Sequence, residues 1–321
     1  MNKNDKVYVA GHTGLAGSAI LGHLQATGFH NLVTRTHREL DLTEPQAVAG
    51  FFAQERPQHV IVAAARVGGI LANDTRPAEF IRENLLIQTN VIHQAYLHGV
   101  KDLLFLGSSC IYPRDCPQPV REEYFLTGPL EQTNFAYAVA KIAGVEMCHA
   151  YNRQYGTRYI CAMPTNLYGS NDNFDLSTSH VLPAMLRKFH ESKLSGKPVV
   201  LWGTGKPRRE FLHADDMADA CLHLLTQLPE RPGSVLPADA PPIINVGCGE
   251  DLTIMELAHL IAEITGYRGE IQWDRSKPDG TPRKLLDVSR MKSLGWRPRI
   301  GLREGIQKVY EHFQQAATVN Q

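Results

Sequence analysis

The chain has 321 residues with 33 basic and 33 acidic side chains, so its formal net charge is zero. This balance does not indicate a nucleic-acid-binding or membrane-surface protein, because both partners select for a basic chain or patch. A hydrophobic content of 43% and a length sufficient for one large domain or two coupled ones indicate an ordinary globular protein.

The ends and the cysteines add little to this class. We expect no secretory signal and no membrane span, because the first residues are polar and no apolar run is long enough. The six cysteines are scattered, without the paired spacing of a zinc site or the density of a disulfide framework. The sequence therefore predicts no metal and a reducing, cytoplasmic environment.

Strand-like and helix-like segments alternate through the first half of the chain. Short apolar runs predict strands at 6–10, 32–34, 59–63, 102–106 and 159–163. Apolar periodicity predicts helices at 15–25, 44–54, 80–98 and 136–153. This alternation is typical of an α/β protein with a Rossmann-type doubly wound parallel sheet.

The pattern changes after residue 170. A segment rich in Asn, Ser, Asp and Gly predicts a loop over 168–179, and five prolines indicate an exposed connection over 229–242. Further helices are predicted at 180–190, 215–228 and 253–264, with short strands at 199–201 and 243–246. We expect one domain over 1–170, rejoined by segments near 198–225 and 240–250. A smaller domain over 171–321 would then close over the carboxyl edge of the sheet, where ligands of such sheets bind.

A glycine-rich turn follows the first predicted strand and opens the first predicted helix. Its spacing is Gly11-x-x-Gly14-x-x-Gly17. Glycines allow the backbone to turn tightly and to approach a pyrophosphate, and the helix N-terminus offers free amides. The turn therefore predicts a dinucleotide site, with a ligand-free structural turn as the alternative.

The residues after the second strand bear on the choice of nicotinamide cofactor. An acid at the end of this strand would bind the ribose hydroxyls of NAD. Here Arg35, His37 and Arg38 follow instead, and guanidinium groups suit a 2′-phosphate. We therefore favour NADP, with solvated surface charges as the alternative. Asp41 comes later and is expected to contact the adenine.

Tyr137 and Lys141 lie four residues apart on one predicted helix, so their side chains share a face. An ammonium near a phenol would lower the pKa of the tyrosine and make it a general acid or base. Ser108 follows the fourth strand and would add a hydrogen bond to a substrate oxygen. The alternatives are an ordinary helix face for the pair and a turn residue for Ser108.

These motifs resemble those of the extended short-chain dehydrogenase/reductase family over essentially the whole chain. Longer segments are similar to its GDP-4-keto-6-deoxy-mannose epimerase-reductases: residues 65–70 (ARVGGI), 107–113 (GSSCIYP), 163–169 (MPTNLYG), 209–213 (REFLH) and 277–284 (KPDGTPRK). The resemblance implies that the first domain binds NADP and the second a GDP-linked 4-keto-6-deoxy sugar. It implies inversion at carbons 3 and 5, then NADPH-dependent reduction at carbon 4 to give GDP-L-fucose. It also implies a homodimer through the helices at 80–98 and 136–153.

The resemblance implies roles for five catalytic residues. Tyr137 would give a proton to the ketone oxygen, helped by Lys141 and Ser108. Cys110 and His180 would remove and return protons on opposite faces of the sugar. A nearby cation or dipole can bring a thiol pKa toward neutrality, and histidine exchanges protons near pH 7. The alternatives are a small buried hydrophobe for Cys110 and a surface histidine at a helix start for His180.

The resemblance also implies ligand contacts. Those to the cofactor are Gly11, His12, Thr13, Gly14, Leu15, Ala16, Gly17, Arg35, His37, Arg38, Asp41, Leu106, Gly107, Ser108, Ser109, Lys141, Pro164, Thr165, Asn166, Leu167 and His180. Those to the GDP-sugar are Lys188, Trp202, Arg209 and Lys284, with solvated surface charge as the alternative for the lysines. The chain departs from the pattern of bacterial members at Thr13 and His37, where these have arginines linked to the NADP phosphate; Arg35 and Arg38 are the available substitutes.

Three other functions fit part of the pattern. A 4,6-dehydratase of the same superfamily typically has an acidic pair near the serine, where this chain has Ser109-Cys110. A nucleotide-sugar 4-epimerase would not need Cys110 and His180. A non-catalytic NADP-sensing module would be expected to lose the Tyr137 and Lys141 pair, which is intact.

Overall fold

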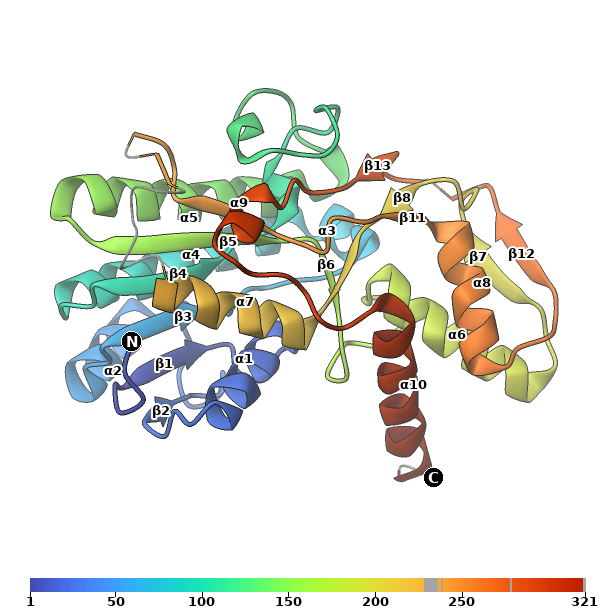
Figure 1. The fold of residues 1–321 in the computed structure, drawn as a ribbon, viewed down its shortest axis with the longest axis horizontal. Coiled ribbons are helices and arrows are strands. Elements are labelled where there is room, and N and C mark those ends of the chain that lie inside the picture. Colours follow the sequence, from blue (N-terminus) through green and yellow to red (C-terminus); the bar gives the residue numbers. More distant parts are fainter. Residues whose placement is uncertain (228–235, 238, 278, 320–321) are drawn as a thin grey trace.

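The computed structural model describes residues 1–227, 236–237, 239–277 and 279–319. Most of the predicted proline-rich connection at 229–242 lies outside the described residues. The described chain forms a larger lobe around a parallel sheet and a smaller lobe built on α6, α8 and α10 (Figure 1).

The central sheet has six strands among the described residues, all parallel, in the order β10-β5-β4-β3-β1-β2. Their bounds are β1 Val7–Ala10, β2 Leu32–Val33, β3 His59–Val62, β4 Asp102–Leu106, β5 Arg158–Pro164 and β10 Ile243–Val246. β1 pairs with β2 on one side and β3 on the other, so the chain changes direction at β1. Ligands of doubly wound sheets bind beyond the carboxyl ends of the strands at such a switch point.

Helices cover both faces of this sheet. One face packs against α1 (Leu15–Ala26) and α7 (Ala214–Gln227), and the other against α2 (Pro45–Glu55), α4 (Pro77–Leu97) and α5 (Phe135–Tyr155). Successive side chains of a strand point to opposite faces, so Val7 and Val9 join the first layer and Tyr8 and Ala10 the second. Burial on both faces explains why the strands are continuous apolar runs.

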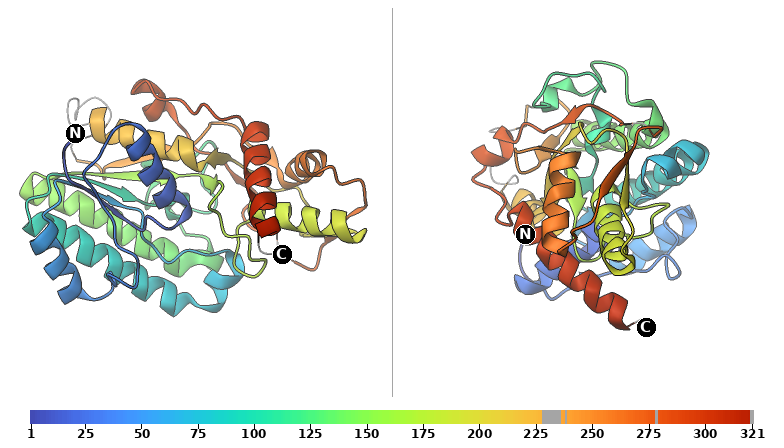
Figure 2. Two further views of the ribbon diagram at one scale, coloured as in Figure 1. Left: turned by 90° about the horizontal axis from the view of Figure 1, so that it is seen from below. Right: turned by 90° about the vertical axis from the view of Figure 1, so that its right-hand side faces the viewer.

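The smaller lobe has its own apolar core, formed by α6 (Val181–Ser195), α8 (Ile254–Thr265), α10 (Leu302–Val319) and the parallel pair β7 (Val199–Trp202) and β12 (Ile271–Asp274). Figure 2 shows these elements beside the carboxyl edge of the sheet rather than stacked on one of its faces. A capping box of Thr253 and Glu256 begins α8, which explains its sharp start in the sequence.

Short strands connect the lobes. β8 (Arg208–Arg209) pairs with β11 (Leu252–Thr253) and β13 (Arg283–Lys284), and β6 (Asn166–Tyr168) pairs with β9 (Phe211–His213). Between β8 and β9 lies Glu210, which is fully buried and accepts backbone hydrogen bonds from Gly249 (2.6 Å) and Leu286 (3.0 Å). One carboxylate thus fixes three segments distant in sequence.

The short helices are α3 (Ile70–Thr75), α9 (Ser289–Ser293) and the 3-10 turns η1 (Ser109–Ile111), η2 (Glu122–Tyr124) and η3 (Gln132–Asn134). None of the helices in the described ranges is both long and apolar enough to span a bilayer.

The structure confirms the predicted parallel α/β class and the predicted strands and helices to within a few residues. Of the segments expected to rejoin the first domain, β10 lies in the central sheet and α7 against α1, while β7 lies in the smaller lobe. The domain boundary itself remains a prediction. Helix α10 was not predicted from the sequence, although Leu302, Ile306, Val309 and Phe313 follow helical spacing.

Candidate active site

The glycine turn has a geometry that only glycine allows. Gly11 has φ +83°, and a Cβ there would approach the Cα of Ala64, just beyond β3, to 2.6 Å. A Cβ on Gly17 would overlap the backbone carbonyl of Gly11. Gly14 caps α1 without a side chain, so the first amides of the helix stay open, and the buried Nδ1 of His12 has no partner among the described residues. The turn therefore fits a dinucleotide pyrophosphate.

The basic residues after β2 differ in their availability. Arg35 is bound by Glu55 (Nη2 to Oε1, 2.5 Å) and lies over the ring of Phe51. Arg38 is exposed and forms no ion pair with any described residue, and His37 is also exposed, 3.8 Å from a carboxylate oxygen of Asp41. Arg38 is therefore the freer guanidinium for a phosphate.

Asp41 has a local structural role. Its Oδ1 accepts hydrogen bonds from the amide (2.9 Å) and the hydroxyl (2.8 Å) of Thr43. These bonds lower the pKa of Asp41, so the side chain is ionised and fixed in a turn before α2. Contact with the adenine remains a prediction.

Four predicted residues converge where β4 ends. Ser108 caps η1, and its hydroxyl accepts a hydrogen bond from the amide of Cys110 (3.3 Å) and lies close enough to the phenol of Tyr137 to influence its pKa. Lys141 on α5 is 3% exposed, and its ammonium donates to the carbonyl of Leu106 (2.7 Å). Gly107 leaves room for the side chain of Met163, which a Cβ would overlap. The sheet edge thus carries a hydroxyl, a thiol, a phenol and an ammonium.

The predicted effect of Lys141 on Tyr137 is wrong for this geometry. Burial raises the pKa of Tyr137, with a further rise from Cys110 and a partial offset from the Ser108 hydrogen bond. Burial also lowers the pKa of Lys141 to about 8. Burial is the largest influence on the phenol, and the Lys141 ammonium donates to the carbonyl of Leu106. Tyr137 is therefore a neutral phenol, the form that can donate a proton.

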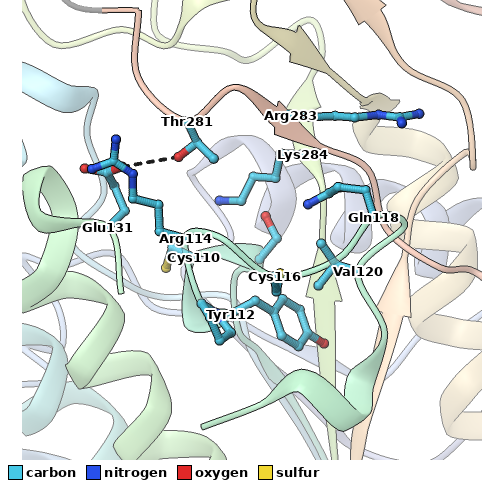
Figure 3. Close-up of a pocket in the computed structure, with 12 residues that line it drawn as sticks. Cys110, Tyr112, Arg114, Cys116, Gln118, Val120, Glu131, Thr281, Arg283 and Lys284 are labelled. Atoms are coloured by element: carbon cyan, nitrogen blue, oxygen red, sulfur yellow. Dashed lines mark hydrogen bonds and ion pairs between the residues drawn. The ribbon is translucent and has the colours of Figure 1, made fainter. Parts of the chain in front are cut away.

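The pKa expected for Cys110 is also wrong in direction. Its thiol is 5% exposed, and burial raises its pKa more than the cationic Lys284 and Lys141 and the Ser108 hydrogen bond lower it. Lys284 comes from β13, one of the short strands that connect the lobes, and both residues line a small pocket (Figure 3). In this chain Lys284 lies beside the candidate base.

His180 is the N-cap of α6, directly after the loop at 170–179. Its side chain has access to solvent, and crowding by neighbouring protein lowers its pKa, which favours the neutral imidazole. The structure thus places His180 on the smaller lobe, whereas Cys110 follows β4 of the larger one.

The segment after β5 is held mainly by its polar side chains. The hydroxyl of Thr165 and the amide of Asn166 both donate to the carbonyl of Glu210, at 3.2 and 2.8 Å. Because these two side chains are bound to Glu210, the backbone from Pro164 to Leu167 is what lies along the carboxyl edge of the sheet. Their contacts to a cofactor remain a prediction.

The predicted GDP contacts lie on elements of the smaller lobe and its connecting strands. Lys188 on α6 donates to the carbonyl of Val200 (2.9 Å), and its ammonium lies 5.8 Å from the centre of the half-exposed Trp202 ring. Lys277 lies at a similar distance from the same ring. Arg209 is half-buried on β8 beside Lys284 of β13, and burial lowers its pKa. An indole with two cations on its ring suits an aromatic base, and the guanidinium of Arg209 suits a phosphate.

Further residues of the pocket were not predicted from the sequence. Arg114, Glu131 and Thr281 line it, and Glu131 lies 3.5 Å from the Nε of Arg114 and 3.3 Å from the hydroxyl of Thr281 (Figure 3). Hydrogen bonds and Arg114 lower the pKa of Glu131 despite its partial burial, so it is an anion among cations. Spacing and periodicity do not signal the place of Glu131 in the pocket, because Arg114 and Thr281 come from distant segments, although its bonds to Thr133 are local.

Comparison with known proteins gives a consistent result. Residues 7–247 match the family described as "NAD dependent epimerase/dehydratase family". A putative GDP-L-fucose synthase 2 from Arabidopsis thaliana is 56% identical over 98% of this chain and 93% of its own length. The GDP-L-fucose synthase of Escherichia coli K12 is 52% identical, over 96% of each chain. The solved structure of a GDP-mannoheptose C4 reductase from Campylobacter jejuni with NADP bound is 42% identical, with a TM-score of 0.90 and 98% and 99% of the two chains covered.

Proposed function

The chain belongs to the NAD dependent epimerase/dehydratase family and to its GDP-L-fucose synthase branch, and from this premise we propose its reaction and the roles of its residues. It converts GDP-4-dehydro-6-deoxy-D-mannose to GDP-L-fucose by epimerisation at carbons 3 and 5 and reduction at carbon 4. The observation that carries this function is the full-length identity of 52–56% to GDP-L-fucose synthases.

The cofactor is NADP, which supplies the hydride for the reduction when it is bound. The glycine turn supports this, since Gly11 and Gly17 let β1, the turn and α1 pack closely while the first amides of α1 stay open. Arg38 is proposed to bind the 2′-phosphate, because it is exposed and unpaired among the described residues whereas Arg35 is bound by Glu55. A guanidinium can bind a phosphate through two parallel hydrogen bonds.

In the reduction, the neutral phenol of Tyr137 gives its proton to the oxygen on carbon 4. Ser108 donates a second hydrogen bond to this oxygen, which stabilises the negative charge that develops there. The closeness of Ser108 to the phenol of Tyr137 supports a shared target for the two hydroxyls. Lys141, fixed on Leu106, keeps a positive charge under the reacting centre.

In the epimerisation, Cys110 and His180 act on the carbons next to the ketone. The ketone acidifies the hydrogens there, and the electron pair released by each proton transfer goes to the ketone oxygen. The two residues come from different lobes, which supports attack from opposite faces of a sugar bound between them. A plain C4 reductase would need neither residue.

One experiment tests the function. Purified protein is mixed with GDP-4-dehydro-6-deoxy-D-mannose and NADPH or NADH, and the products are resolved by NMR. We expect NADPH oxidation and GDP-L-fucose. A product reduced at carbon 4 but not inverted at carbons 3 and 5 would indicate a reductase alone. No NADPH oxidation would refute the assignment and reopen the 4-epimerase, the 4,6-dehydratase and the NADP-sensing module.

We also propose a homodimer through α4 and α5, in a reducing cytoplasm. The joint face of the two helices carries an aromatic group in which Tyr96 and Tyr155 are stacked at 4.1 Å beside Tyr151, and Leu97 is 56% exposed. An exposed apolar and aromatic face of this kind suits an interface. Light scattering of the wild type and of Leu97→Glu tests the dimer; a monomeric wild type would refute it. Cell fractionation tests the compartment, which the free cysteines favour.

A further inference from the structure

Cys110 and Lys284 are distant in the sequence but line the same pocket. Cys110 is in the 3-10 turn η1 after β4, and Lys284 is the last residue of β13. Figure 3 shows the side chain of Lys284 turned into the pocket that Cys110 also lines. The thiol is nearly excluded from solvent, at 5% exposure.

The backbone around Lys284 is fixed against the segment that follows Cys110. Lys284 itself pairs with Arg209 in the short sheet of β8 and β13. The next amide, of Leu285, donates to the side chain of Gln118 (2.9 Å), and its carbonyl accepts from Val120 (2.7 Å). The buried Glu210 then accepts the amide of Leu286. The backbone position of Lys284 is therefore built into the fold.

Among the charges around Cys110, that of Lys284 has the largest effect on ionisation of the thiol. Burial opposes ionisation of the thiol, and Lys284 is the strongest influence in favour of the thiolate, ahead of the Ser108 hydrogen bond and of Lys141. Tyr137 also lies near the thiol, but its phenol is neutral.

Other groups act on Lys284 in turn. Burial and Arg209 disfavour its ammonium, whereas Cys110, Cys116 and Glu131 favour it. Burial is the largest of these influences and leaves the pKa of Lys284 below its usual range, and the anionic Glu131 on the same pocket favours the charged form that acts on the thiol.

We propose that Lys284 is a positioning residue for epimerisation, whose ammonium stabilises the thiolate of Cys110. This role goes beyond the phosphate contact expected for Lys284 and rests on the proposed function. The thiol first loses its proton to solvent, leaving a thiolate beside the ammonium. The thiolate then takes a proton from the carbon next to the ketone, so that an S–H bond forms and the C–H bond breaks. The released electron pair passes to the ketone oxygen, where Ser108 and Tyr137 donate hydrogen bonds.

The first test needs no substrate, so it stands apart from the assigned reaction. The rate of Cys110 alkylation by iodoacetamide is measured against pH by peptide mass spectrometry. Lys284→Met removes the charge at similar length, and Lys284→Arg keeps it. Lys206→Met removes an exposed charge elsewhere in the same lobe. Alkylation of Cys248, outside the pocket, reports any general loosening of the fold.

We expect Lys284→Met to move the alkylation profile of Cys110 upward by about one pH unit, about a tenfold slower reaction at a given pH on the rising limb. Lys284→Arg and Lys206→Met should stay near the wild type, and Cys248 should react alike in all four proteins. A Lys284→Met profile that superimposes on the wild type would overturn the proposal. So would Lys284→Arg behaving like Lys284→Met.

A second test uses the reaction itself. Lys284→Met should lose incorporation of solvent deuterium at carbons 3 and 5 and regain it at higher pH, whereas loss of a phosphate contact alone would raise KM without moving the pH profile. The latter result would overturn the proposal. A wild type that makes no GDP-L-fucose would refute the proposed function, while the alkylation profile would still decide the link between Lys284 and Cys110.

Discussion

The ammonium of Lys141 donates a 2.7 Å hydrogen bond to the carbonyl of Leu106, the last residue of β4. This bond ties α5 to the sheet edge and places the ammonium 5.8 Å from the centre of the Tyr137 ring. The charge therefore lies under the ring while the phenol oxygen is left to Ser108. Tyr137 keeps its proton until a substrate oxygen takes it.

Tyr137→Phe removes that proton donor and little else, because the ring can keep its edge contact with Phe80. We expect the reduction rate to fall by about 10²–10⁴-fold, the usual worth of a positioned general acid. Exchange of solvent deuterium at carbons 3 and 5 should be affected much less, since Ser108 remains to stabilise the enolate. Stopped-flow NADPH absorbance and NMR of the recovered sugar measure the two steps. Equal losses in both steps would contradict this division of roles.

Because Lys141 is buried, we expect the pH profile of the reduction rate to have an alkaline limb. Burial lowers its pKa to about 8, so its ammonium is present below that pH and is lost above it. We expect the reduction rate to fall as the pH rises through about 8. Lys141→Arg, which stays charged, should react more slowly but without this limb. The unfolded chain binds more protons between pH 8 and 10.5, so the free energy of unfolding should rise with pH there. A limb that persists in Lys141→Arg would exclude Lys141 as its source.

Cys110→Ser and His180→Asn separate the epimerisation from the reduction. An alcohol is a far weaker base than a thiolate, and an amide cannot exchange protons near neutral pH. Each variant should lose deuterium incorporation by about 10²-fold or more while still binding NADPH. NMR would show which carbon each residue serves, and fluorescence titration would give the NADPH affinity. Undiminished incorporation at both carbons in either variant would remove that residue from the mechanism.

The parallel sheet was predictable because its strands carry local signals. A strand buried on both faces must be a continuous apolar run, and β4 at Asp102–Leu106 was predicted to the residue. The short strands β8 and β13 could not be predicted in this way. Each has two residues, and both consist of charged side chains whose pairing depends on partners distant in sequence.

The residues of the site also divide into those that local sequence signals predicted and those that they could not predict. Motifs predicted that Ser108, Tyr137 and Lys141 would lie together, because one strand end and one helix carry them. Spacing could not predict that Lys284 would lie beside Cys110, nor that Lys141 would donate to a backbone carbonyl. The pKa directions depend on burial, which only the fold supplies, so those for Tyr137 and Cys110 were wrong.

Arg35 and Arg38 should respond differently to removal. Arg38→Ala should raise KM for NADPH by about 10–100-fold, as expected for one charge-assisted contact, and leave KM for NADH nearly unchanged. Arg35→Ala instead breaks the ion pair with Glu55 and should lower stability more than cofactor preference. Steady-state kinetics with both cofactors and thermal unfolding distinguish the two effects. A larger loss of NADPH preference in Arg35→Ala would reverse their assigned roles.

Asp172, in the loop before His180, predicts a stability that depends on pH. Burial raises the pKa of this carboxyl to about 7, and its Oδ2 has no hydrogen-bond partner among the described residues. Between about pH 4 and pH 7 the folded protein therefore binds more protons than the unfolded chain, so the free energy of unfolding falls as the pH rises.

Asp172→Asn removes the charge and keeps the shape of the side chain. The amide of Asn173 donates to Oδ1 of Asp172, and the amide oxygen of the variant can accept the same bond. We expect this variant to exceed the wild type by about 1–3 kcal/mol at pH 8 and to approach it below pH 4. Urea denaturation at several pH values measures the difference, with Asp175→Asn, an exposed site in the same loop whose pKa is lowered by hydrogen bonds, as the contrasting control. If the difference in free energy of unfolding between Asp172→Asn and the wild type does not change with pH, the carboxyl of Asp172 ionises in the folded protein without a free-energy cost.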